Sequence, residues 1–272
     1  MKPHFVDIVT DTDLSSLKHE NLAEWLYRRK MIVLRDLDLD LGGFYDLFSR
    51  FVKPWPISAN THLGNEVLSK FDETRYAMIY DNEDKNTLQG HLGWHSDQPL
   101  ARFGTKVYDY PVRALYAANI PNPKEGITSW LDRGWVIDKR PDLVARAEKT
   151  TITITNRWRT PGRGGDDETR PLISVHPVTK RKIIELSSFT RKNSGFRQWI
   201  VDSSEDGKDG YDLLNELTIA SSAAENVYEH MWRKGDFIIW SNFDTMHKRT
   251  DFTQTSDNRR IHYRLNGFNT WQ

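Results

Sequence analysis

The chain has 272 residues, with 38 Lys plus Arg and 38 Asp plus Glu, so its formal net charge at pH 7 is zero. A balanced charge argues against a general nucleic-acid or membrane-surface binder, which would carry a basic excess. The chain has no cysteine, which excludes disulfides, thiolate metal sites, iron–sulfur clusters and cysteine nucleophiles.

Neither a leader peptide nor a membrane span is predicted. The N-terminus, Met1 to Asp7, has no apolar stretch and no small-residue cleavage site. No segment approaches the roughly 18 apolar residues that a membrane span needs. We therefore expect a cytoplasmic protein that acts on a small molecule and binds neither nucleic acid nor membrane. The sequence is compatible with a homo-oligomer.

Helices are predicted early in the chain, and short strands dominate after them. Apolar residues at helical spacing predict helical segments over 13–29, 41–52, 131–149 (with Pro141 near a helix start) and 212–233. Apolar runs and alternating patterns predict strands over 31–34, 76–80, 112–120, 150–155, 236–240 and 260–268. Segments 172–176 and 182–186 resemble a hairpin, and the Gly- and Arg-rich segment 159–167 is typical of a loop.

This order of elements favours a mainly β fold with flanking helices, in which two sheets form a double-stranded β-helix (jelly-roll) barrel. We expect one domain over residues 1–272. Its N-terminal part, to about residue 75, combines helices and strands, and the barrel core follows over 76–272 with helical insertions.

A metal site is indicated by Trp94–Asp97, which reads Trp-His-Ser-Asp. A His and an Asp two residues apart lie on the same face of a β-strand, so both side chains point the same way. One further His, such as His247, completes the two-histidine, one-carboxylate set of non-haem iron(II) oxygenases. His91 is a rival ligand, but Gly90 and Gly93 disfavour the helix that its spacing would suit.

An anion site is indicated by the arginine-rich segment Arg259–Arg264. Arg260 and Arg264 are four residues apart on a predicted strand, so both face the barrel interior together with His262, whereas Arg259 faces away. A buried arginine without a partner is costly. Two inward arginines therefore imply anions nearby, supplied by ligands or by acidic side chains.

These segments resemble the taurine dioxygenase-like (TauD/TfdA) family of iron(II)/2-oxoglutarate oxygenases. Three family signatures occur in the correct order: W-H-x-D at Trp94–Asp97, a strand with W-x-N and a distal His at 237–247, and R-R-[IV]-x-x-R at Arg259–Arg264. Weaker similarities lie at 31–36 and 175–182. The resemblance extends, with gaps, from about residue 20 to residue 270.

The resemblance implies a catalytic iron(II) site formed by His95, Asp97 and His247. It also implies that Arg260 holds the distal carboxylate of 2-oxoglutarate, which is a co-substrate with O2. Thr128 matches a family G-x-T segment that assists this arginine, although Ile127 replaces the usual acidic residue.

The implied reaction oxidises a C–H bond by hydroxylation or desaturation and releases succinate and CO2. Related halogenases carry Gly or Ala in place of the carboxylate ligand, so Asp97 disfavours halogenation. Arg264 is expected to contact an anionic group of the primary substrate or to share the co-substrate pocket. Many family members act on amino acids or on intermediates of specialised metabolism. Further candidate substrate contacts are His91, Tyr80 and Phe189.

Two other functions remain open at this point. A non-oxidising, metal- and ligand-binding jelly-roll (cupin-like) protein would share the His-x-Asp…His pattern but would not need Arg260 at the interior end of the barrel. A metal-free acid–base enzyme would use His95 and Asp97 as a dyad, which leaves His247 and the arginine strand without a role.

Overall fold

The computed structural model describes residues 3–10, 17, 19–54, 67–70, 76–81, 91–97, 111–156, 168–176, 179–186, 199–205, 208–253 and 259–268. These residues do not include Phe189 or the predicted loop 159–167. They also leave out residues 13–16 and 18 of the predicted helix 13–29. The backbone of Tyr80 is described, but its side chain is not.

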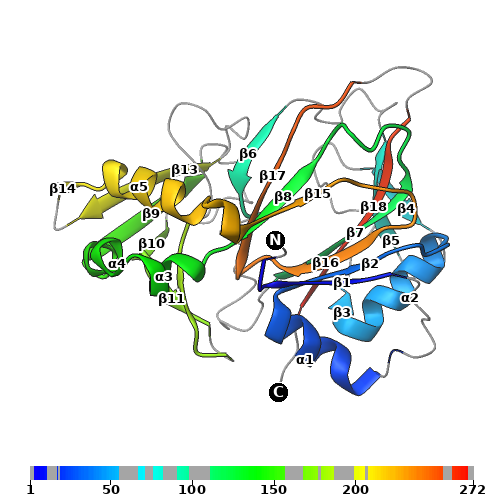
Figure 1. The fold of residues 1–272 in the computed structure, drawn as a ribbon, viewed down its shortest axis with the longest axis horizontal. Helices are drawn as coiled ribbons and strands as arrows, with labels where there is room; N and C mark the ends of the chain where they lie inside the picture. The colour runs from blue at the N-terminus through cyan, green and yellow to red at the C-terminus, as the bar shows by residue number, and fades with distance from the viewer. Residues whose placement is uncertain are drawn as a thin grey trace.

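An eight-stranded sheet forms one layer of the fold (Figure 1). Its order is β1-β2-β16-β7-β18-β5-β4, and β3 pairs with β18. β1 pairs with β2 in parallel, and the other pairings in this sheet are antiparallel. The strands are β1 (Val6–Val9), β2 (Met31–Leu34), β3 (Lys53–Pro54), β4 (Val67–Lys70), β5 (Tyr76–Asp81), β7 (Pro111–Asn119), β16 (Phe237–Ser241) and β18 (Ile261–Phe268).

A four-stranded antiparallel sheet, ordered β15-β8-β17-β6, packs against the first sheet. Its strands are β6 (Leu92–His95), β8 (Thr128–Asp132), β15 (Val227–His230) and β17 (Thr245–Arg249). Side chains from both sheets form a shared core that contains Val33 and Ile238 from the large sheet and Trp130 from the small one. This two-sheet arrangement confirms the predicted jelly-roll architecture.

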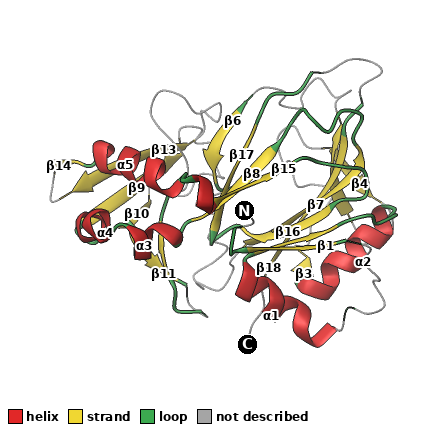
Figure 2. Cartoon of the chain, in the orientation of Figure 1, coloured by secondary structure: helices red, strands yellow, loops and turns green. Residues whose placement is uncertain are grey.

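Two helices, α1 (His19–Arg29) and α2 (Leu41–Phe51), cover the outer face of the large sheet (Figure 2). Asp40 caps α2, because its carboxylate accepts a hydrogen bond from the Gly43 backbone N–H. Strand β2 is buried on both sides: Ile32 and Leu34 pack toward the helices, and Met31 and Val33 pack toward the barrel interior. This double burial explains its unbroken apolar sequence.

A lateral lobe extends from the small sheet (Figure 1). Its elements are α3 (Trp135–Lys139), α4 (Pro141–Ala147), β9 (Thr150–Asn156), β10 (Glu168–Pro171), β11 (Ile173–Val175), β12 (Lys182–Ile184), β13 (Trp199–Glu205), β14 (Lys208–Asp209) and α5 (Tyr211–Ser221). Leu131 of β8 and Met246 of β17 point outward into the core of this lobe. The neighbouring residues on these two strands therefore face the barrel interior.

Most predicted elements are confirmed, but two helical predictions extend too far. Residues 131 and 132 belong to β8, and the helices begin only at Trp135 and Pro141. The predicted helix 212–233 ends at Ser221 and is followed by a 3₁₀ turn (Ala224–Asn226) and by β15. The buried Asn226 side chain donates hydrogen bonds to the Ser221 and Asp132 carbonyls, which ties the chain to β8 and starts a new strand.

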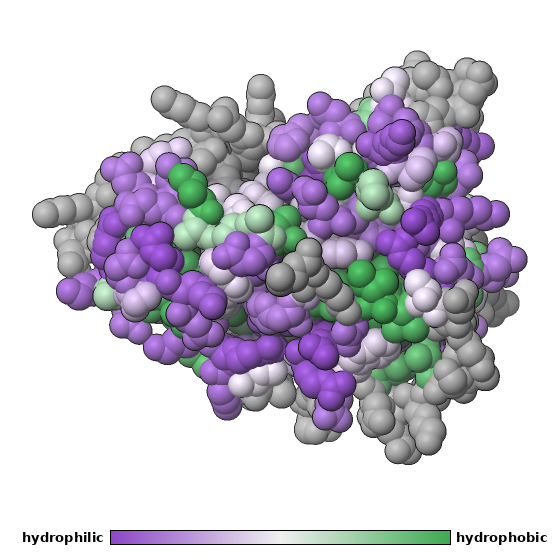
Figure 3. Space-filling view, viewed as in Figure 1, coloured by the Kyte–Doolittle hydropathy of each residue, from purple (hydrophilic) through white to green (hydrophobic). Residues whose placement is uncertain are grey.

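The face of the molecule in Figure 3 is mostly hydrophilic, with hydrophobic residues in separate groups. Large hydrophobic side chains that are exposed in the described segments are Val175, Tyr211, Ile219 and Met231. Within those segments, no helix has the length and apolar character needed to cross a membrane.

Candidate metal centre

Two neighbouring strands of the small sheet bring His95 and His247 together. The two residues are direct partners in the antiparallel pairing of β6 with β17. Their side chains therefore lie on the same face of the sheet, and their ring centroids are 4.2 Å apart. A single strand pairing thus brings together two residues that lie 152 positions apart in the sequence.

Asp97 reaches these histidines differently from the way the sequence predicts. His95 is the last residue of β6, and Asp97 lies two residues further on, in a bend. Strand alternation therefore does not align the two side chains. Instead, Asn242 holds the Asp97 backbone twice: its Oδ1 accepts from the Asp97 N–H at 3.1 Å, and its Nδ2 donates to the Asp97 carbonyl at 2.8 Å.

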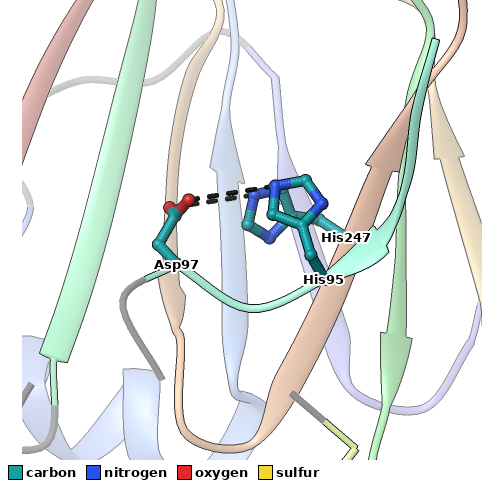
Figure 4. Close-up of side chains that lie close together, drawn as sticks. All are labelled: His95, Asp97 and His247. Carbon is teal, nitrogen blue, oxygen red and sulfur yellow. Dashed lines mark ion pairs between the residues drawn. The ribbon is translucent and has the colours of Figure 1, made fainter. Parts of the chain in front are cut away.

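The three side chains converge on one point (Figure 4). The Asp97 carboxylate oxygens lie 3.9 Å from His95 Nε2 and 3.8 Å from His247 Nε2. One ligand atom from each residue lies within 4.8 Å of those of the other two. Two imidazole nitrogens and one carboxylate are the donor set that non-haem iron(II) prefers, with further coordination positions left for other ligands. The three residues therefore fit an iron(II) ion.

The two histidines are oriented by different means. The His95 Nδ1–H donates to the Gly93 carbonyl at 2.7 Å, which makes Nε2 the ring nitrogen that faces the other two ligands. His247 Nδ1 is buried and has no hydrogen-bond partner among the described residues. Its ring is instead held between Trp130, with centroids 6.3 Å apart, and Trp240, at 5.5 Å.

The protonation states of the three groups suit metal binding. Burial, followed by the neighbouring His95, lowers the pKa of His247 to about 3. Burial also lowers the pKa of His95. For Asp97, burial alone would raise the pKa, but the neighbouring charge of Arg264 is the largest of the influences that lower it overall. Near neutral pH the site thus offers two neutral imidazoles and an ionised carboxylate, the forms that a metal binds.

Arg264 lies beside this set. Its Nη2 donates to Asp97 Oδ2 at 2.8 Å, and its Nε donates to Asn266 Oδ1 at 3.3 Å. The fully buried Arg113 places its Nε 3.8 Å from the same Asp97 oxygen. Arg264 therefore faces the barrel interior, as predicted, and its partner in this structure is an acidic side chain.

Arg260 lies directly before β18, is only 9% exposed, and has no carboxylate partner in the described segments. Its Nη2 donates to the Gly126 carbonyl at 3.0 Å, while its Nε is buried and lacks a partner there. Burial and the charge of Arg249 lower the pKa of Arg260 to about 9. Arg259 is exposed, so the predicted opposite orientation of the two arginines is confirmed.

Gly126 explains how the backbone approaches Arg260 so closely. Its φ is +60°, a conformation that favours glycine. A Cβ at this position would also lie 2.8 Å from Arg260 Cζ. The predicted G-x-T segment therefore supplies a glycine that this contact needs.

Thr128 begins β8 and is buried. Its Oγ1 accepts a hydrogen bond from Trp232 Nε1 at 2.9 Å. Arg249, its partner in β17, shares the Phe252 ring with Arg260: the two guanidinium carbons lie 4.8 and 5.1 Å from the ring centroid. A buried guanidinium that has no carboxylate partner among the described residues and shares an aromatic ring with a second arginine forms a site that suits an anion.

Among the remaining candidates, His91 is the one whose side chain the structure describes, and it does not join the metal ligands. His91 is exposed and precedes β6, and its imidazole is not part of the ligand cluster, so the rival ligand is excluded from that cluster. Tyr80 lies on β5 opposite His262. The roles of Asn242 and Arg113 were not predicted; Asn242 belongs to the W-x-N signature, which was the available signal for it.

The chain is similar in sequence to known dioxygenases. The model of the taurine catabolism dioxygenase TauD, TfdA family matches residues 3–265. An (S)-phenoxypropionate/alpha-ketoglutarate-dioxygenase of Sphingobium herbicidovorans is 24% identical over 206 residues, which are 69% of this chain and 67% of the relative. An alkylsulfatase of Acinetobacter baylyi is 25% identical over 173 residues, 57% of this chain and 50% of the relative.

A solved structure supports the fold. The crystal structure of a taurine dioxygenase from Burkholderia xenovorans superposes with a TM-score of 0.66 at 19% identity, over 98% of this chain and 90% of that chain. Because the family model covers nearly the whole sequence, the chain belongs to the TauD/TfdA family of iron(II)- and 2-oxoglutarate-dependent oxygenases.

Proposed function

We propose that this enzyme oxidises a C–H bond of a small, anionic organic substrate by hydroxylation or desaturation, with His95, Asp97 and His247 as its iron(II) ligands. The observation that carries the proposal is the convergence of these three ligand atoms within 4.8 Å. We further propose that residues 1–272 act as one oxygenase domain, since the lobe and the small sheet share a core through Leu131 and Met246.

His95, Asp97 and His247 would hold the iron, which with 2-oxoglutarate and O2 would supply the oxidant for the C–H bond, with succinate and CO2 as the products of the co-substrate. In a hydroxylation, one oxygen atom of O2 enters succinate and the other enters the product. The protein holds the ligands in fixed orientations: Gly93 sets the His95 ring, the two tryptophans set His247, and Asn242 sets Asp97. Such preorganisation is the protein's main contribution to cofactor chemistry.

Arg260 binds the distal carboxylate of 2-oxoglutarate in this proposal, and Thr128 assists. The planar guanidinium matches a carboxylate through two hydrogen bonds. The support is that Arg260 is buried, lacks an acidic partner among the described residues, and lies beside the charge of Arg249. A dicarboxylic oxo acid would supply the missing negative charge.

Arg264 contacts the anionic group of the primary substrate in this proposal. Its guanidinium lies 2.8 Å from a ligand oxygen, so a group bound to it would be held next to the iron. The two relatives described above are named for phenoxypropionate and for alkyl sulfate esters, both of which carry an anionic group. His91, Tyr80 and Phe189 are further proposed substrate contacts.

Succinate production tests the proposal. The enzyme is incubated with iron(II), 2-oxoglutarate and air, together with a panel of carboxylates, sulfonates and sulfate esters. We expect succinate formation that a true substrate stimulates, with a product that gains one oxygen or loses two hydrogens. Binding of metal and 2-oxoglutarate without succinate from any of the panel would favour the cupin-like alternative, and an absence of 2-oxoglutarate binding would overturn the main proposal.

A further inference from the structure

His262 is a buried residue to which the proposed reaction gives no role. It lies on β18 between Arg260 and Arg264 and is 5% exposed. Tyr263 and Leu265, which alternate with it, pack on the opposite side of the sheet against the helical layer. His262 therefore faces the barrel interior, on the same side as the two arginines.

The ring of His262 has an unsatisfied polar atom. Its Nε2 is buried and has no hydrogen-bond partner among the described residues. Trp232 packs edge-on against it, with ring centroids 4.6 Å apart. Trp232 is itself fixed, because its indole N–H donates to Thr128. A buried ring nitrogen without a partner is unfavourable, and a molecule that bound beside it would relieve that cost.

The electrostatic surroundings keep this ring neutral. Burial, followed by the charges of Arg260 and Arg249 and by His230, lowers the pKa of His262 well below its usual range. No acidic group of the described residues is among these causes. A neutral imidazole carries one N–H donor, so it can donate a hydrogen bond to an anion without adding a third positive charge beside the two arginines.

We infer that His262 is a specificity-determining residue that donates a hydrogen bond to the distal carboxylate of the oxo acid held by Arg260. This inference rests on the proposed function. The carboxylate then accepts hydrogen bonds from two kinds of donor. The charged guanidinium of Arg260 neutralises the carboxylate, and the neutral imidazole of His262, which Trp232 fixes, limits where the carboxylate can lie. An oxo acid without a distal carboxylate, such as pyruvate, gains nothing from His262.

Calorimetric binding of 2-oxoglutarate and pyruvate to the zinc-loaded protein tests the inference. His262→Met removes the donor and keeps an apolar side chain of similar size, His262→Gln keeps an N–H donor, and Tyr263→Phe is the matched control on the opposite side of β18. We expect His262→Met to weaken 2-oxoglutarate binding about tenfold, or about 1.4 kcal/mol. His262→Gln should remain within about threefold of the wild type, and pyruvate and zinc affinities should not change.

Equal 2-oxoglutarate affinities for His262→Met and the wild type would overturn this inference while leaving the proposed function intact, provided that Arg260→Met still loses binding. A wild-type protein that binds no 2-oxoglutarate would instead overturn the proposed function, and this inference with it. If His262→Met does not fold, imidazole ¹⁵N spectra of the zinc-loaded wild type decide the matter. The His262 resonance, which is missing in His262→Gln, should shift with 2-oxoglutarate and not with pyruvate, and an unmoved resonance would contradict the inference.

Discussion

The two buried charge sites inside the barrel differ in how their charges are balanced. At the metal centre, the Asp97 carboxylate is matched within the protein by Arg264 at 2.8 Å and by Arg113 at 3.8 Å. At the second site, Arg260 has a neighbouring arginine and no acidic partner among the described residues. The first site is thus organised before any ligand arrives, whereas the second site needs an incoming anion to balance it.

Removing the carboxylate should have the largest effect. We expect Asp97→Ala to lower manganese(II) or iron(II) affinity by about 1,000-fold, because it deletes a ligand and leaves Arg264 and Arg113 without their shared partner. Anaerobic calorimetry measures the affinity, and the exposed Asp138→Ala is the control. Near-normal metal binding in Asp97→Ala would remove Asp97 from the ligand set.

Removing the unbalanced charge should affect the other site alone. We expect Arg260→Met to weaken 2-oxoglutarate binding about 100-fold, the loss typical of a buried charged hydrogen-bond partner, with metal affinity unchanged. The matched control is Arg259→Met, since Arg259 is adjacent and exposed. If both variants bound 2-oxoglutarate equally, Arg260 would not be its anchor.

Loosening the metal centre without deleting a ligand should have a smaller effect. Asn242→Ala removes both hydrogen bonds to the Asp97 backbone, and we expect metal affinity to fall about tenfold because the ligand loses its fixed position. Asn242→Asp keeps the acceptor for the Asp97 N–H and loses only the donor, so it should lie between the wild type and Asn242→Ala. An Asn242→Ala protein with normal metal affinity would show that the bend holds Asp97 unaided.

Acidification should gradually lower the free energy of unfolding of the metal-free protein. The folded-state pKa of His247 is about 3, and that of His262 is also well below 6.5. Between these values and about 6.5 the unfolded chain binds more protons, so stability falls as pH is lowered, by up to about 1.4 kcal/mol per pH unit for each such histidine. Urea unfolding at pH 7.5 and pH 5.5 measures the difference, and unchanged stability would contradict these lowered pKa values. His262→Gln should reduce the pH dependence of the unfolding free energy by the contribution of His262.

Sequence patterns were sufficient for many elements. The apolar run 31–34 and the amphipathic segment from Leu41 were found because their local patterns match the structures they form. The strand that follows Ser221 was not predicted. It depends on the hydrogen bonds of Asn226 and on pairing with β8, and both involve residues that are distant in the sequence. Local spacing carries no information about such pairings.

The sequence by itself determined the chemical inventory: two histidines, a carboxylate and an arginine strand, in an order typical of one enzyme family. Only the tertiary structure decided how they meet. Pairing of β6 with β17 places His247 against His95, and Asn242 turns Asp97 toward both. The structure also decided which arginine lacks an acidic partner among the described residues, because charge balance in a buried site depends on distances in space that a linear sequence does not specify.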